Sequence, residues 1–282
     1  MLYSAIHWPK QGLVSDLIDG INKFIKNYLD TSDIYLVFDR YFSYSIKSDT
    51  RKIRVGSLRR NHFLSLTSVL PAKDICLSSV KTKENLIELI SSELLRRYAI
   101  KEAQHFIIIT SKSKYPEEVH AGVRITRQDL ATELDEADYI ICHQVDSAIQ
   151  EGKTVVRVFS SDTDVFVMLC NLYKERKWFP AEVYMDDFQR GKSFISIKET
   201  TKRHSYTSSM LIPVHALSGC DSVPMMFGIG KVKVLGILKD HPLQHLGRAD
   251  ANEEDVMQEA KEFVAACYGG KNVSSSANRW YI

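Results

Sequence analysis

The chain has 282 residues, of which 44% are apolar, 10% are aromatic and 26% are charged. Its 37 basic and 35 acidic residues give a formal net charge of +2. This profile excludes a disordered chain, a collagen-like repeat and a small disulfide scaffold. The charge is nevertheless segregated, because residues 40–60 are rich in Lys and Arg and residues 131–165 are rich in Asp and Glu. A basic segment attracts polyanions and an acidic one attracts cations, so both kinds of binding have to be considered.

The cysteine spacing and the length of the apolar runs bear on the cellular compartment of the protein. The five cysteines are widely spaced and include no CxxC pair, which argues against a zinc ribbon or a redox dithiol. No apolar run approaches the ~20 residues of a membrane span, and the start of the chain lacks the pattern of a signal peptide. We therefore expect a soluble nuclear or cytoplasmic protein that is not secreted.

Hydrophobic periodicity predicts the elements in chain order. Helical spacing predicts helices over residues 13–29, 45–64, 84–99, 135–150, 162–173, 210–218, 231–239 and 253–267. Short apolar runs predict strands over residues 34–38, 105–110, 154–159, 181–186 and 193–198. Weak periodicity predicts loops over residues 66–80 and 111–130.

The alternation of apolar strands with helices predicts the fold class. Such strands are typical of a parallel sheet that helices cover on both faces. We expect a three-layer α/β/α protein with a central, mostly parallel sheet, in which residues 1–282 form a single domain. In such sheets, functional residues gather just beyond the carboxyl ends of the strands.

Acidic residues occur where this fold would place a site. Asp39 follows the first predicted strand, and Asp162 and Asp164 follow the third. Clustered carboxylates repel one another unless cations neutralise them, and hard divalent ions prefer oxygen ligands. Two such ions could activate water and stabilise the leaving oxygen of a phosphodiester. The candidate metal ligands are Asp39, Glu136, Asp138, Asp162, Asp164 and Asp221.

Each acid also has a purely structural interpretation. Glu136 and Asp138 can complement a helix dipole in its first turn. Ser161 can be an N-cap with Asp164 completing a capping box, and Asp221 can be a turn residue. The combined pattern favours the metal site because it would otherwise require several coincidences.

Two further features are candidates for phosphate binding. Lys47, Arg51 and Arg54 share one face of the predicted basic helix, where they would hold a phosphate or simply face solvent. Phe227-Gly-Ile-Gly-Lys231 is a glycine turn before a helix, but it lacks the spacing of a P-loop. Its candidate binding residues are Gly228, Gly230, Lys231 and Lys233. His143 and His215 are interpreted as core or helix residues.

The order of these blocks is familiar. The blocks are Val37-Phe-Asp39-Arg, Ser45-Ile-Lys47, Asp135-Glu-Ala-Asp138, Ser161-Asp-Thr-Asp164, and Leu217-Ser-Gly-Cys-Asp221 with Gly228-Ile-Gly-Lys231. Together they resemble the flap-endonuclease/XPG branch of the PIN-like nuclease superfamily, and more closely a group of animal proteins within it. The likeness covers about residues 6–60 and 133–240.

The resemblance implies an activity. It implies that the six acids bind two Mg²⁺ or Mn²⁺ ions that cleave phosphodiesters in structured DNA or RNA. It assigns Lys47 and Arg54 to catalysis at the scissile phosphate. It also implies a helix–two-turn–helix over residues 210–240 that grips duplex backbone at Gly228, Gly230 and Lys231, with K⁺ as an expected monovalent ion.

One departure from that family keeps other functions open. The family has a further Asp on its first strand, before a stretch that Trp8-Pro9 resembles, and this sequence has no acid there. We therefore expect the first strand to be truncated. The main alternative is a catalytically degenerate module that binds nucleic acid or a protein without cutting. A weaker alternative is a metal-dependent phosphatase of another α/β fold.

Overall fold

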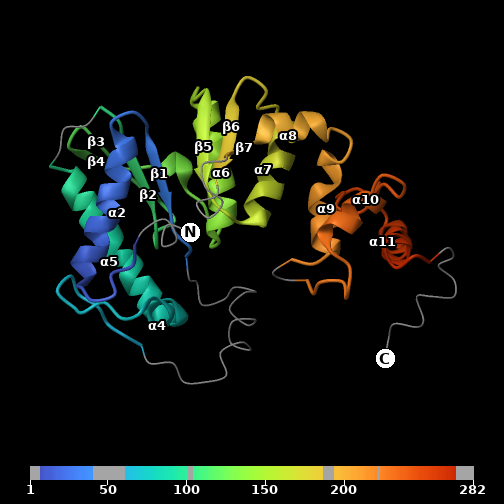
Figure 1. Ribbon diagram of the computed structural model, residues 1–282. Coiled ribbons are helices and arrows are strands. Elements are labelled where there is room, and N and C mark those ends of the chain that lie inside the picture. Colours follow the sequence, from blue (N-terminus) through green and yellow to red (C-terminus); the bar gives the residue numbers. More distant parts are fainter. Residues whose placement is uncertain (1–6, 41–60, 101–103, 187–193, 221–222, 271–282) are drawn as a thin grey trace. The chain divides into compact units, whose positions relative to one another are not determined.

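The chain divides into two compact units in the computed structural model (Figure 1). Unit 1 comprises residues 1–152, 159–161 and 187–193, and unit 2 comprises residues 153–158, 162–186 and 194–282. The structure describes residues 7–40, 61–100, 104–186, 194–220 and 223–270. No helix in these described ranges is long and apolar enough to cross a membrane. The prediction of one domain over residues 1–282 stays a prediction.

Unit 1 is a four-stranded sheet with helices packed against it. Its elements are α2 (Val14–Leu29), β1 (Ile34–Val37), α4 (Lys73–Ser78), α5 (Val80–Tyr98), β2 (Ile107–Thr110), β3 (Glu117–His120), β4 (Val123–Thr126), η1 (Gln128–Leu130) and α6 (Ala137–Gln150). The strand order is β1-β2-β3-β4, in which β1 and β2 are parallel and the other two pairs are antiparallel.

The core of unit 1 follows from the predicted periodicity. The apolar residues of α2 recur at helical spacing, and Val14, Ile18 and Ile21 are fully buried. They share one cluster with the apolar side of α5 and with Ile107 and Ile109 of β2. Figure 1 shows α2 and α5 lying side by side next to the sheet. The predicted helices and strands of this region are confirmed, apart from the basic helix over residues 45–64. That helix lies outside the described residues except for 61–64, which are not helical.

The segment predicted as a loop over residues 111–130 is instead a hairpin. Strands β3 and β4 pair in antiparallel register, and the turn between them places Ala121 and Gly122 at positive φ. Half-buried Arg127 holds the hairpin through ion pairs with Glu118 at 2.7 Å and Asp129 at 2.6 Å. The prediction was wrong because it passed over the short alternation Val123-Arg-Ile-Thr126, which forms β4 although every one of its residues is exposed. Likewise, α4 lies inside the loop predicted over residues 66–80.

Unit 2 combines a small sheet with a helical end. Its elements are β5 (Val155–Phe159, whose last residue belongs to unit 1), α7 (Thr163–Glu175), β6 (Glu182–Asp186), β7 (Phe194–Ser196), α8 (Ile197–Arg203), η2 (Ser208–Met210), α9 (Leu211–Leu217), α10 (Lys231–Ile237) and α11 (Glu253–Cys267). The strand order is β5-β6-β7, with β6 and β7 antiparallel. Helices α9, α10 and α11 share a separate core around Val214, Val234, Leu238 and Phe263.

The protein is therefore a mixed α/β chain, as predicted, but its sheets are mixed. Among the strand pairs whose register is described, one is parallel and three are antiparallel. The expectation of a mostly parallel sheet was wrong for these pairs. Strands β2, β3 and β4 follow one another through short connections without a crossover helix, and such connections join antiparallel strands.

None of the five cysteines forms a disulfide bond, and all five lie in the described part of the chain. Cys76, Cys142, Cys170 and Cys267 are buried, and each is at most 4% exposed. Burial raises the pKa of Cys76 to about 11 and the pKa values of Cys142 and Cys170 to about 12. Burial also raises the pKa of Cys267. These four thiols are protonated at neutral pH.

Candidate functional site: two acidic corners

The first group of predicted acids meets at the start of α6. Asp39 directly follows β1 and Phe38, and its Oδ1 accepts a hydrogen bond from the backbone N–H of Ala137 at 3.0 Å. Ala137 lies between Glu136, at the N-cap position of α6, and Asp138, in the first turn. We call Asp39, Glu136 and Asp138 the α6 corner. The structure thus brings Asp39 to the helix start that the sequence singled out 98 residues further along the chain.

Arg40 holds the backbone next to this corner. The sequence counted Arg40 in the basic segment, but its side chain is only 2% exposed. Its backbone N–H donates to Asp135 O at 2.7 Å, and its guanidinium donates to carbonyl oxygens at distances from 2.5 to 3.3 Å. Those oxygens belong to Ser111, Lys114, Thr132 and Leu134. Burial lowers the pKa of Arg40. Arg40 is therefore a clamp for the chain that leads into α6 and does not face a polyanion.

The second group of acids begins α7. Asp162 is the N-cap residue, and its side chain accepts from the backbone N–H of Asp164 at 2.9 Å. The structural alternative that made Ser161 the cap is wrong by one residue. The cap arises because Asp162 has extended backbone angles and a short acceptor side chain. The side chain of Asp164 is one-third exposed.

Asp164 is also held by a residue that sequence reasoning missed. His215 of α9 places its Nε2 2.8 Å from Asp164 Oδ1, and the side chain of His215 is 12% exposed. His215 was interpreted as a core or helix residue because a single histidine in an apolar helix carries no spacing signal. The contact joins residues 51 positions apart, so only the tertiary fold reveals it. We call Asp162, Asp164, His215 and Lys231 the α7 corner.

Lys231 contacts the other side of the same imidazole. Its Nζ lies 3.0 Å from His215 Nδ1, 2.7 Å from Gly219 O and 3.4 Å from Ser218 Oγ. Burial lowers the pKa of Lys231, whereas the charge of Asp164 acts in the opposite direction. The ammonium is thus bound to the end of α9. The predicted contact of Lys231 with a phosphate stays a prediction.

Gly219 makes this arrangement possible. Its φ is +107°, and a Cβ built there would lie 2.5 Å from Met225 Cα, well inside the closest normal contact. A residue with a side chain would therefore displace the backbone that gives Lys231 its carbonyl partner. By contrast, the space around Gly228 and Gly230 is open to 4 Å, and Lys233 is exposed. These positions remain accessible to a ligand.

Several predicted residues lie outside the described part of the chain. They are Lys47, Arg51, Arg54 and Asp221. Across the residues that are described, no group of three or more His, Cys, Asp or Glu side chains is placed to hold a metal ion. The acids that the structure does describe are gathered within each unit at a helix start.

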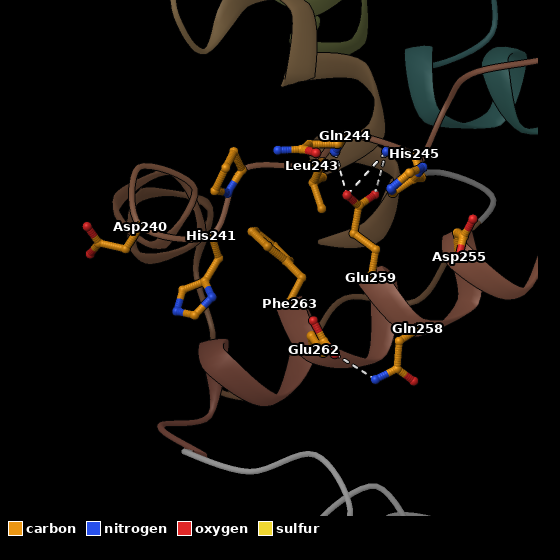
Figure 2. A pocket seen from close by; sticks show the side chains of 11 residues that line it. Asp240, His241, Leu243, Gln244, His245, Asp255, Gln258, Glu259, Glu262 and Phe263 are labelled. Carbon is orange, nitrogen blue, oxygen red and sulfur yellow. Dashed lines mark hydrogen bonds between the residues drawn. The ribbon is translucent and has the colours of Figure 1, made fainter. Parts of the chain in front are cut away.

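A pocket of about 400 Å³ lies elsewhere in unit 2, between α11 and the chain that follows α10 (Figure 2). Figure 2 shows Glu259 of α11 pointing at Gln244 and His245. Its carboxylate accepts from the backbone N–H groups of Gln244, His245 (3.0 Å) and Leu246 (2.7 Å). Burial raises the pKa of Glu259, but these three donors outweigh it and lower the pKa. Glu259 thus has a structural role, since it holds the chain that lines the pocket. None of the predicted site residues lines this pocket.

Comparisons of this chain with protein-family models, with curated proteins and with solved structures found no match.

Proposed function

We propose that this chain is a divalent-metal-dependent nuclease that hydrolyses phosphodiester bonds in structured DNA or RNA. The observation that carries the proposal is the bond from Ala137 to Asp39. It gathers the strand-end acid and the acidic helix start of the α6 corner, which the sequence had assigned to one metal site from separate blocks. In unit 2, the second acidic block also lies at the start of a helix.

The donor chemistry of the corners fits a hard divalent ion. Mg²⁺ takes one or two carboxylates directly and keeps several waters, so it does not require the group of three that is absent from the described residues. Asp39 and Asp162 each use one carboxylate oxygen to accept a backbone N–H group. That bond fixes the orientation of each carboxylate. Bound ions of this kind supply Lewis-acid stabilisation of charge on a phosphate and make water more acidic.

The residues of the chain would then have separate roles. Asp39, Glu136 and Asp138 in one unit, and Asp162 and Asp164 in the other, are the proposed ligands. Asp221 completes the proposed set. Lys47 and Arg54 would stabilise negative charge on the scissile phosphate, with Arg51 on the same helical face. Gly228, Gly230 and Lys233 would contact the nucleic-acid backbone.

A cleavage assay tests the proposal. Wild-type protein is incubated with labelled flap DNA, duplex RNA and single strands, in Mg²⁺, in Mn²⁺ and in EDTA, and with a small phosphomonoester. Cleavage of an oligonucleotide in metal alone is expected, and it should fall by at least about 10²-fold in the double variant Asp162→Asn, Asp164→Asn. Glu262→Gln is the matched control, because it neutralises an exposed acid of the same unit and should leave cleavage unchanged. Equal activity of the wild type and the double variant would exclude the proposed site.

A second candidate is a non-catalytic binding module. The open space around Gly228 and Gly230, with exposed Lys233 nearby in the chain, favours it, because a phosphate could bind there without a metal. It predicts binding of nucleic acid that weakens with salt and is lost when Lys47, Arg51 and Arg54 are replaced by Ser, without turnover in any metal. A binding affinity that changes neither with salt concentration nor with these substitutions would count against this candidate. Turnover of the phosphomonoester alone would instead favour the phosphatase alternative.

A further inference from the structure

The chain of contacts from Lys231 to Asp164 fixes the protonation pattern of His215. A lysine ammonium has three donors and no acceptor. Because Lys231 Nζ lies 3.0 Å from His215 Nδ1, Nδ1 must be the accepting nitrogen. The proton of the neutral imidazole is then on Nε2, and it is donated to Asp164 Oδ1 at 2.8 Å. The contacts are therefore directional, and they run from the ammonium through the imidazole to the carboxylate.

We propose that Lys231 and His215 are positioning residues that orient the carboxylate of Asp164 through this directional chain. Asp164 is held at two points, because Asp162 accepts from its backbone N–H while His215 donates to its Oδ1. The remaining oxygen, Oδ2, is thereby aimed by the first two bonds. Second-sphere donors of this kind orient ligating carboxylates, and their loss commonly costs 10- to 100-fold in metal affinity or activity.

The same lysine ties this orientation to the glycine turn. Lys231 is the first residue of α10 and bonds the carbonyl of Gly219, beyond the end of α9. A displacement of the start of α10 would therefore move the partner of His215 directly. Gly228 and Gly230, which precede Lys231, are open to a ligand.

The kinetic part of this inference rests on the proposed function, but the geometric part does not. Nitrogen-15 NMR of the imidazole tests the geometry directly in the wild-type protein. We expect His215 to be the neutral Nε2–H tautomer at pH 7.5, and to become a mixture of tautomers in Lys231→Met. The matched control Lys239→Met removes an exposed lysine of the same unit and should leave the signal unchanged. A wild-type Nδ1–H tautomer or a doubly protonated imidazolium would overturn the proposal.

Metal titration and kinetics test the consequence for Asp164. In Lys231→Met and His215→Leu, the Kd for Mn²⁺ should rise, and kcat should fall, by about 10-fold or more, with little change in KM for the oligonucleotide. His215→Gln retains a donor towards Asp164 and should recover most of the loss, whereas a merely structural defect would not be rescued selectively. His241→Gln is the control, because it replaces an exposed histidine of unit 2. Circular dichroism confirms that each variant is folded.

The two proposals fail in different ways. If the wild type cuts no substrate in any metal, the proposed nuclease function fails, while the tautomer and the Mn²⁺ titration still decide the orientation of Asp164. If the wild type cuts and both Lys231→Met and His215→Leu retain Mn²⁺ affinity and kcat, the positioning role is excluded and the nuclease function stands.

Discussion

The two acidic corners are held in opposite ways. In the α6 corner, the acid stabilises a helix: Asp39 accepts a hydrogen bond from the backbone N–H of Ala137 and so fixes where α6 begins. In the α7 corner, the acid is stabilised by other side chains: the imidazole of His215 contacts the carboxylate of Asp164, and Lys231 contacts the other nitrogen of that imidazole. The bond described for Asp39 is to backbone, whereas Asp164 is supported by a series of side chains. Similar acidic blocks in a sequence therefore do not imply similar local support.

The basic residues beside the corners show the same contrast. Arg40 binds only backbone carbonyl oxygens and is 2% exposed, whereas Lys231 binds one carbonyl, one hydroxyl and one imidazole. Both cations are turned inward. A cation thus supports the residues around each acidic group, and Arg40 shows that a member of the basic segment can serve inside the fold.

Removing the Arg40 clamp should have the largest effect. Arg40→Met leaves several carbonyl oxygens near the α6 corner without a donor, and it should lower the free energy of unfolding by about 3 kcal/mol. Urea unfolding measures the loss, and hydrogen exchange read by peptide should locate it in unit 1. Arg248→Met is the control, because Arg248 pairs with Asp250 on the exposed surface. Equal losses in the two variants would show that Arg40 is not a clamp.

A methyl group at Gly219 should damage the α7 corner. Gly219→Ala combines a φ of +107° with a contact of 2.5 Å to Met225 Cα, and should cost about 2 kcal/mol. Gly236→Ala has the opposite expected sign, about 0.5–1 kcal/mol of stabilisation, because Gly236 lies in α10 with nothing within 4 Å. Thermal unfolding of both variants checks the pair. A neutral Gly219→Ala would mean that the turn adapts without strain.

A carboxylate that belongs to neither corner gives a pH test. The pKa of Glu259 is lower in the folded protein than in the unfolded chain, so its stabilisation is present above the unfolded pKa and is lost as pH falls through the folded pKa. Glu259→Gln should cost about 1.5 kcal/mol at pH 7, and the difference from wild type should shrink as the pH falls below about 4. Unfolding measured against pH checks this. Glu262→Gln, on the same helix, should show no such dependence.

The cap at the start of α6 should give the smallest effect. Asp39→Ala removes the acceptor for Ala137 and should cost about 1 kcal/mol, while Asp39→Asn keeps an acceptor oxygen and should cost only a few tenths. Both variants should lose nuclease activity if Asp39 is also a metal ligand. If Asp39→Asn is fully active and activity falls only in the less stable Asp39→Ala, Asp39 is only a helix cap. The α6 corner would then not belong to the proposed metal site.

The predictable parts of the structure are those with a local signal. Helix α2 and strand β2 were predicted because their apolar residues follow a helical period or an unbroken run. The hairpin β3–β4 has neither pattern: β4 shows only a four-residue alternation, and all of its residues are exposed. The start of α7 was predicted to within a residue, and the gathering of Asp39 with the start of α6 followed from strand-end reasoning.

The parts that could not be predicted depend on distant contacts. Arg40 and Lys231 appear in the sequence as surface cations, and nothing near them shows that their partners are carbonyl oxygens 71 to 94 residues away or an imidazole 16 residues away. His215 shares this property, because its partner Asp164 lies in another helix. Sequence reasoning thus finds the candidate ligands and misses the residues that support them.

The buried thiols can report local opening of each unit separately, because each unit contains two of them. Cys76 and Cys142 lie in unit 1, and Cys170 and Cys267 lie in unit 2. A thiol that is both inaccessible and protonated reacts with an alkylating reagent only when its surroundings open transiently. Labelling rates, resolved for each cysteine by mass spectrometry, would therefore time the opening of the two units separately in one sample of the native sequence, without an added probe.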